Sequence, residues 1–132
     1  MKAEIIAFAR PDEALDLLSV PPPRELSSGE FAGSRKLIQG LAYGLRHEYP
    51  QAKSSFEEAG HLINNNPDLL VRLALNQAYV FYLAKNKTAA EEQYSSAIDL
   101  AHKYGLPRME ATAHVSLGKL LMDQEIYDRA IN

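Results

Sequence analysis

The residues best suited to acid–base or metal chemistry in this chain are its four histidines and its paired acids. Glu57 and His61 are four residues apart in a predicted helix, so they share one face, where a carboxylate could orient an imidazole. Such a pair is more often a surface contact worth only tenths of a kcal/mol. The adjacent acids Glu57–Glu58 and Glu91–Glu92 point in diverging directions on a helix, which is typical of a solvated face.

Sequence motifs of known catalytic sites are missing. The chain contains no HExxH pair, no Gly-rich phosphate loop after a strand and no G-x-S-x-G elbow. The glycosylation sequon Asn86-Lys87-Thr88 is more simply interpreted as a turn that caps a helix. We therefore expect no catalytic residue, no metal site and no cofactor, and the protein is not expected to be an enzyme.

Composition narrows the partners. The chain has 132 residues, 46% hydrophobic and 23% charged, which fits one soluble globular domain. Its net charge of -3 leaves no basic half for nucleic acid, and the absence of cysteine fits a reducing compartment. Arg10 and Pro11 interrupt the apolar start, which resembles neither a signal peptide nor a membrane span. We expect a cytoplasmic protein with no nucleic-acid or membrane partner.

A pattern of small and large residues recurs along the chain. The spacing of Ala52, Phe56 and Ala59 returns 38 residues later as Ala90, Tyr94 and Ala97. A small residue stands twelve positions before the first alanine of each copy, and a large residue follows that small residue three positions later. The pairs are Gly40 and Tyr43, Ala78 and Phe81, and Gly118 and Leu121. A period of 38 to 40 residues is typical of stacked supersecondary units, in which small residues allow close crossing and aromatic residues fill the grooves.

Capping signals predict that each unit is a pair of helices. The expected helices cover about 28–46, about 50–63, 67 to about 84, about 88–104 and about 107–122. Ser27 with Glu30 and Thr88 with Glu91 form candidate capping boxes, Asn66 precedes Pro67 as a cap, and Gly105 ends a helix. No alternating run of β-branched residues predicts a strand. The predicted fold class is therefore all-α, an antiparallel array of helix pairs.

These residues resemble the tetratricopeptide repeat (TPR) family. The resemblance rests on Gly40-Tyr43-Ala52-Phe56-Ala59, on Ala78-Phe81-Ala90-Tyr94-Ala97 and on "LGKLLMDQEIYDRAI" at 117–131. It implies helix-pair repeats stacked as a right-handed α-solenoid. The units are longer than the usual repeat of about 34 residues. They resemble the long repeats of bacterial signalling proteins, such as MalT-like regulators and proteins with a CHAT domain.

The expected organisation has two parts. Residues 1–24 form a degenerate N-terminal half-repeat with a Pro-rich connector, and residues 25–132 form a TPR-like array. Its repeats cover about 28–66, 67–106 and a truncated 107–132. Because this array begins and ends within a repeat, we hypothesise a fragment of a larger multidomain protein, or self-association through the open repeat ends or the groove.

The resemblance also implies a ligand-facing stripe along the first helix of each repeat. The candidate partner-binding residues are Leu37, Leu41, Arg72, Leu75, Asn76, Tyr79, Tyr82 and Lys119. Leu37 and Leu41 stand where relatives that clamp chaperone carboxylates have cationic and amide residues, which argues against that activity. We expect a non-catalytic scaffold that binds a peptide or a partner helix, with Tyr79 and Tyr82 as apolar anchors and Arg72 and Lys119 fixing orientation.

Two points stay open at this stage. The alternative function is an effector-sensing regulatory arm of a bacterial signalling or transcription-regulating protein. The groove itself is expected to be covered in the isolated chain, either by a second copy or by the N-terminal segment at 4–18.

Overall fold

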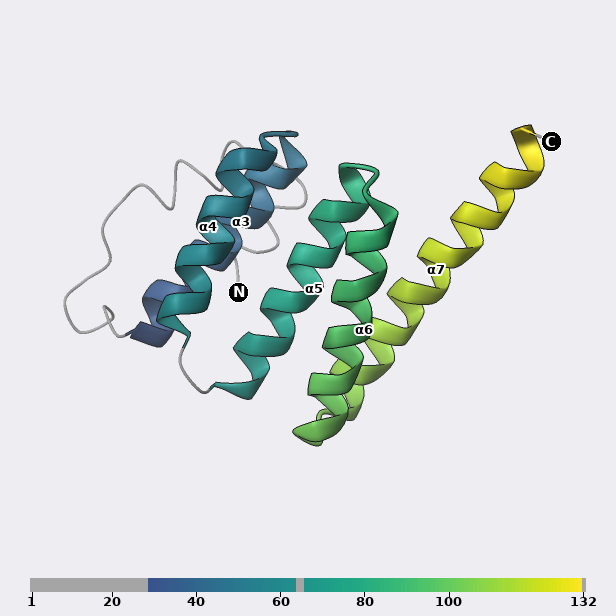
Figure 1. The fold of residues 1–132 in the computed structure, drawn as a ribbon. Helices are drawn as coiled ribbons and strands as arrows, with labels where there is room; N and C mark the ends of the chain where they lie inside the picture. The colour runs from purple at the N-terminus through teal and green to yellow at the C-terminus, as the bar shows by residue number, and fades with distance from the viewer. Residues whose placement is uncertain (1–28, 64–65, 132) are drawn as a thin grey trace.

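A computed structural model describes residues 29–63 and 66–131 of the chain (Figure 1). These residues form α3 (Gly29–Leu45), α4 (Tyr49–Leu62), α5 (Pro67–Leu83), α6 (Lys87–Lys103) and α7 (Pro107–Ile131). Within the described residues the prediction of an all-helical chain is confirmed. The predicted half-repeat and connector at 1–24, and the N-terminal segment expected to cover the groove, lie outside them.

Helix starts follow from polar caps and proline. The Asn66 side chain accepts a hydrogen bond from the Leu69 backbone N–H at 3.1 Å, and Pro67 then occupies the first turn of α5, as predicted. The predicted cap at Thr88 is wrong, because α6 begins at Lys87 and Asn86 accepts from the Ala89 N–H at 3.3 Å. Asn caps a helix at least as well as Thr and stands two residues earlier.

Three helices end in the same left-handed turn. The residues that stop α3, α5 and α6 are His47 and Lys85, both with φ of 63°, and Gly105 with φ of 66°. After each, a backbone N–H reaches back to a carbonyl five residues earlier: Glu48 to Tyr43, Asn86 to Phe81 and Leu106 to Ala101, all at 2.9 Å. This is the Schellman arrangement, and it reverses the chain so that sequence neighbours run antiparallel (Figure 1).

Small residues let α3 and α4 cross closely. A Cβ placed on Gly40 would lie 2.6 Å from the ring of Phe56, and one on Gly33 would lie 2.7 Å from the side chain of Ile63. Ala52 and Ala59 of α4 are fully buried at the same contact. The predicted roles of small residues as clearance and of Phe56 as filler are therefore confirmed for this pair.

The α5 helix lies between the first pair and the rest of the molecule. Its Val80 packs with Ala52 and Phe56 of α4. In a second cluster, Ala78 of α5 packs with Ala90 and Tyr94 of α6 and with Leu120 of α7. Among the described residues the core is thus a series of clusters, each formed by side chains from three consecutive helices, either α3 to α5 or α5 to α7.

The last helix is longer than predicted. The sequence predicts an end near residue 122, whereas α7 continues to Ile131. No proline follows Pro107 to break it, and ion-pair and amide contacts between Glu125 and Arg129 at 2.7 Å and between Gln124 and Asp128 at 2.8 Å support its last turns. The C-terminal part of α7 extends away from the other described helices (Figure 1). No described helix combines the length and apolar composition that a membrane crossing needs.

Candidate partner-binding surfaces

Two of the eight predicted partner-binding residues are core residues. Leu37 and Leu41 of α3 are 1% and 0% exposed. Leu37 packs with Ala59 and Ile63, because Gly33 and Gly40 let α4 cross this side of α3. Neither leucine offers a surface to a partner in this structure, so the sequence pattern placed them on the wrong side of their helix.

Leu75 and Tyr82 of α5 are half-buried among residues of α6 and α7. Leu75 packs against the clusters that contain Ala97 and Tyr94, and Tyr82 packs against the second of these. Much of their apolar surface is therefore already covered within the chain. They help to pack α5 against α6 and α7, and only the exposed part of each side chain can contact a partner.

A polar contact joins α5 to α7 beside these residues. The Tyr82 hydroxyl donates a hydrogen bond to the Asp123 carboxylate at 2.6 Å, and this bond to the carboxylate raises the pKa of Tyr82. Tyr79 stacks on Tyr82 with 6.2 Å between ring centroids and 25° between ring planes. The sequence analysis missed Asp123, because nothing in the local sequence marks a contact that spans 41 residues.

Asn76 is the most unusual of the predicted residues. It is 9% exposed, and its side-chain Nδ2 is buried with no hydrogen-bond acceptor in the part of the chain that the structure describes. An unpaired buried donor costs about 1–3 kcal/mol relative to a paired one. Arg72, four residues before it, is half-buried, and Arg72 and Tyr79 both have interaction partners. We call Arg72, Asn76 and Tyr79 the polar stripe of α5.

Lys119 lies on a different helix and is exposed. Its neighbours on α7 include Val115, Leu121 and Met122, which are 72%, 47% and 61% exposed. The eight predicted residues are therefore divided among the α3 core, the contact with α6, the polar stripe and the surface of α7. They do not form one continuous groove in the described residues.

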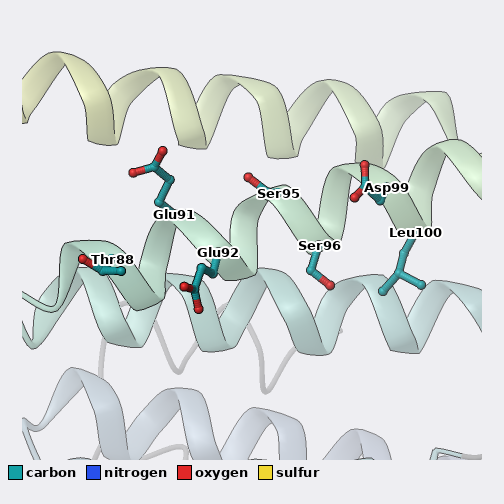
Figure 2. A pocket seen from close by; sticks show the side chains of 7 residues that line it. All are labelled: Thr88, Glu91, Glu92, Ser95, Ser96, Asp99 and Leu100. Carbon is teal, nitrogen blue, oxygen red and sulfur yellow. The ribbon is translucent and has the colours of Figure 1, made fainter.

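The outer face of α6 carries an open, acidic hollow (Figure 2). It is lined by Thr88, Glu91, Glu92, Ser95, Ser96, Asp99 and Leu100. Glu91 and Glu92 point to opposite sides of α6, as predicted for adjacent acids, so their carboxylates do not converge on one point (Figure 2). This face has the geometry of a solvated helix surface. Among the described residues no three potential ligand side chains gather to hold a metal ion.

A second hollow lies between α4 and α5 and is mostly apolar. Its volume is about 400 Å³, and it is lined by Tyr49, Pro50, Lys53, Phe56, Gln77, Val80, Phe81, Ala84 and Asn86. One wall is fixed by Tyr49, whose hydroxyl donates to the Leu83 carbonyl at 3.1 Å. Its polar groups lie among apolar and aromatic side chains, a composition common in sites for small molecules.

Comparison of the chain with protein-family models, with curated proteins and with solved structures gives no match.

Proposed function

We propose that this protein is a non-catalytic interaction scaffold of TPR-like repeats, stacked as a solenoid, that binds a peptide or a partner helix. The proposal is supported by helix pairs that pack through residues at the predicted spacing, as Gly40 packs with Phe56 and Ala78 with Tyr94. The proposal also draws on two surfaces, the polar stripe of α5 and the exposed surface of α7. The binding site proposed is centred on the polar stripe and includes Lys119.

The observation that carries the proposal is the unpaired Nδ2 of Asn76. A bound peptide offers backbone carbonyl groups at regular intervals, and one of these would accept from this donor once the Asn76 side chain turns outward, because Nδ2 is buried in the free protein. The bond would remove a penalty that the free protein bears, so it favours the complex by more than an exposed hydrogen bond would. Tyr79, which stacks on Tyr82 and is only half-buried, presents rigid aromatic surface to the same peptide.

The test uses a phage-displayed library of random twelve-residue peptides selected on the whole chain. Peptides that are enriched are synthesised, and their dissociation constants are measured by isothermal titration calorimetry. We expect Asn76→Leu to weaken binding about tenfold or more, because it removes the donor at nearly the same volume. The same substitution should leave the free protein as stable as before or more stable, since the unpaired group is gone.

A matched control is Ser95→Ala, because Ser95 is exposed and lies on α6, a different helix from the polar stripe. It should leave both peptide affinity and stability unchanged. If no peptide is enriched, or if Asn76→Leu and the control bind equally well, the polar stripe is not the binding site and the proposal fails.

One observation favours the second candidate, an effector-sensing regulatory arm. The apolar hollow between α4 and α5 joins residues of two predicted repeats, so a small apolar ligand there would alter how the repeats meet. A fragment library screened by the shift of the thermal unfolding midpoint tests this function. Hits that lose their effect in Ala84→Leu, which narrows the hollow, would support it, and a screen without such hits would contradict it.

A further inference from the structure

The contact of α4 with α5 and the contact of α6 with α7 are built from residues at equivalent positions. In the first, Phe56 of α4 shares a cluster with Val80 of α5. In the second, Tyr94 of α6, 38 positions after Phe56, shares a cluster with Leu120 of α7, 40 positions after Val80. The two contacts can therefore be compared position by position.

The first contact has smaller side chains at two positions beside the apolar hollow. Val80 and Ala84 line this hollow, whose volume is about 400 Å³. The equivalent residues of α7 are the larger Leu120 and Gln124, and the side-chain Oε1 of Gln124 is buried. The hollow between α4 and α5 thus lies where the second contact has more side-chain volume.

The charge beside the hollow also differs between the two contacts. Lys53 of α4 is the one charged residue in the lining of the hollow. It is exposed, and it forms no ion pair with another residue in the part of the chain that the structure describes. The equivalent residue of α6 is Glu91. The hollow therefore offers a cation to a ligand, where the second contact has an acid.

Two side-chain amides add hydrogen-bond donors to the lining. Gln77 of α5 is half-buried, its carboxamide has no partner among the described residues, and the equivalent residue of α7 is Leu117, which has no polar group. Asn86 caps α6 through its side-chain oxygen, which accepts from the Ala89 N–H at 3.3 Å. This cap leaves the NH₂ group of Asn86 as a donor. A carboxylate, which only accepts hydrogen bonds, suits this set of groups.

The remaining lining is apolar or aromatic. Phe56 and Val80 are 3% and 7% exposed, so they lie at the base of the hollow. Tyr49 forms part of the wall, and its hydroxyl donates to the Leu83 carbonyl at 3.1 Å and lies 2.7 Å from Nδ1 of His47. Because the Tyr49 ring is held at two points, this wall is ordered before a ligand arrives, which lowers the entropy cost of binding.

We propose that the hollow between α4 and α5 binds a carboxylate with an alkyl chain of medium length. The chain packs on Phe56 and Val80, and the carboxylate pairs with Lys53. A volume of about 400 Å³ lies near the lower end of the usual range for ligand sites, about 300–1,000 Å³, which suits octanoate better than a long-chain fatty acid. The inference rests on the second candidate function, because it names the ligand class of the same hollow.

The probes are octanoate, octan-1-ol and acetate, which separate the contribution of the alkyl chain from that of the charged group. Their binding to the whole chain is measured by isothermal titration calorimetry. We expect octanoate to bind with a dissociation constant of about 0.1–1 mM, as is reasonable for a ligand of this size. Octan-1-ol should bind about fivefold more weakly, because it cannot pair with the lysine. Acetate should give no measurable binding.

A matched pair of lysine variants locates the carboxylate. Lys53→Gln should weaken octanoate binding about fivefold, to the level of octan-1-ol, and leave octan-1-ol binding unchanged. The control is Lys103→Gln, an exposed lysine of α6 outside the lining, which should leave both ligands unchanged. Both substitutions are at exposed positions, and thermal unfolding without ligand checks that each variant keeps the fold.

A third variant locates the alkyl chain. Ala84→Gln introduces the residue that α7 has at the equivalent position, so it should reduce the space in the hollow and weaken octanoate and octan-1-ol alike, by about fivefold or more. Ala84 is exposed, so the variant should fold as the wild type does. Unchanged affinity of both ligands in Ala84→Gln would place them outside the hollow and overturn the proposal.

Three further results would overturn it. They are the absence of octanoate binding up to about 10 mM, equal affinity for octanoate and octan-1-ol, and an equal loss of both ligands in Lys53→Gln. If octan-1-ol binds as well as octanoate, the assignment of a carboxylate fails while the second candidate function stands with a neutral ligand. Asn76 is not part of the lining, so Asn76→Leu should leave octanoate binding unchanged, and the scaffold function is decided separately.

Discussion

Helices α5 and α7 place residues of similar type at equivalent positions, but their surroundings differ. Leu75, Phe81 and Tyr82 of α5 pack in a cluster with residues of α6 and α7, whereas Val115, Leu121 and Met122 of α7 are exposed. An apolar pattern on a helix thus predicts that the face is suited to be covered, and it does not say which segment covers it. The difference also separates the residues that hold this fold together from those that are free to bind.

The largest expected difference between the two helices comes from removing large side chains. Tyr94→Ala removes the ring that covers Ala78 and should lower the free energy of unfolding by about 3–5 kcal/mol, because it leaves a cavity between α5 and α6. Met122→Ala, at a residue of α7 that is 61% exposed, should change this free energy by less than about 0.5 kcal/mol. Urea unfolding followed by circular dichroism measures both. Equal losses would mean that Met122 is packed in solution.

Alkaline pH offers a second way to weaken the α5–α6 contact. Burial raises the pKa of Tyr94 from 10.0 to about 12. Because the folded protein holds this proton more tightly, its contribution to stability is fully present below about pH 10 and is lost as the pH rises towards about 12. We expect the unfolding free energy to fall by on the order of 2 kcal/mol across this range through Tyr94.

The control for this prediction is Tyr94→Phe, which keeps the ring and removes the titrating group. At pH 8 it should be close to wild type in stability, and above pH 10 it should lose less stability than wild type. Urea unfolding midpoints at a series of pH values measure both proteins. Parallel curves for the two proteins would show that the Tyr94 hydroxyl is accessible to water.

Adding one methyl group should have opposite effects at equivalent glycines. Gly40→Ala puts a Cβ 2.6–3.0 Å from the buried ring of Phe56, and the resulting crowding should destabilise the protein by about 1–2 kcal/mol after the gain in helix propensity. Gly118→Ala meets no neighbouring helix and should stabilise it by about 0.5–1 kcal/mol. Thermal unfolding midpoints should therefore move in opposite directions. Shifts of the same sign would contradict the comparison of α3 with α7.

Local signals in the sequence were sufficient to predict the helices. Proline, asparagine caps and the glycine at 105 act on the nearest residues, and the observed helix bounds lie within one or two residues of the predicted ones except at the end of α7. The crossing of Gly40 under Phe56 was also predictable, since a small residue and an aromatic residue recur at a fixed spacing and suit each other's volume. These features depend on steric fit within one pair of helices.

The binding surface could not be predicted as well, because it depends on which side of a helix its neighbours occupy. An apolar side chain suits either a core or a groove, and this holds for Leu37, Leu41, Leu75 and Tyr82. Only the packing shows that the first two are buried and that the other two pack with residues of α6 and α7. The unpaired Nδ2 of Asn76 and the bond between Tyr82 and Asp123 likewise depend on distant segments. The exposure of Val115 and Met122 follows from the absence of a described helix beside them.

The smallest expected difference concerns the position where α5 turns and α7 does not. Lys85 has φ of 63°, a left-handed conformation that strains a residue with a side chain, so Lys85→Gly should stabilise the protein by up to about 1 kcal/mol. Glu125, at the equivalent position of α7, is helical and pairs with Arg129 at 2.7 Å. Glu125→Gly should therefore destabilise the protein by up to about 1 kcal/mol, through lower helix propensity and the loss of a weak ion pair.

Differential scanning calorimetry at matched concentrations can resolve changes of this size. A loss of stability in Lys85→Gly would show that α5 does not end in a strained turn, and an unchanged Glu125→Gly variant would show that the last turns of α7 are frayed in solution.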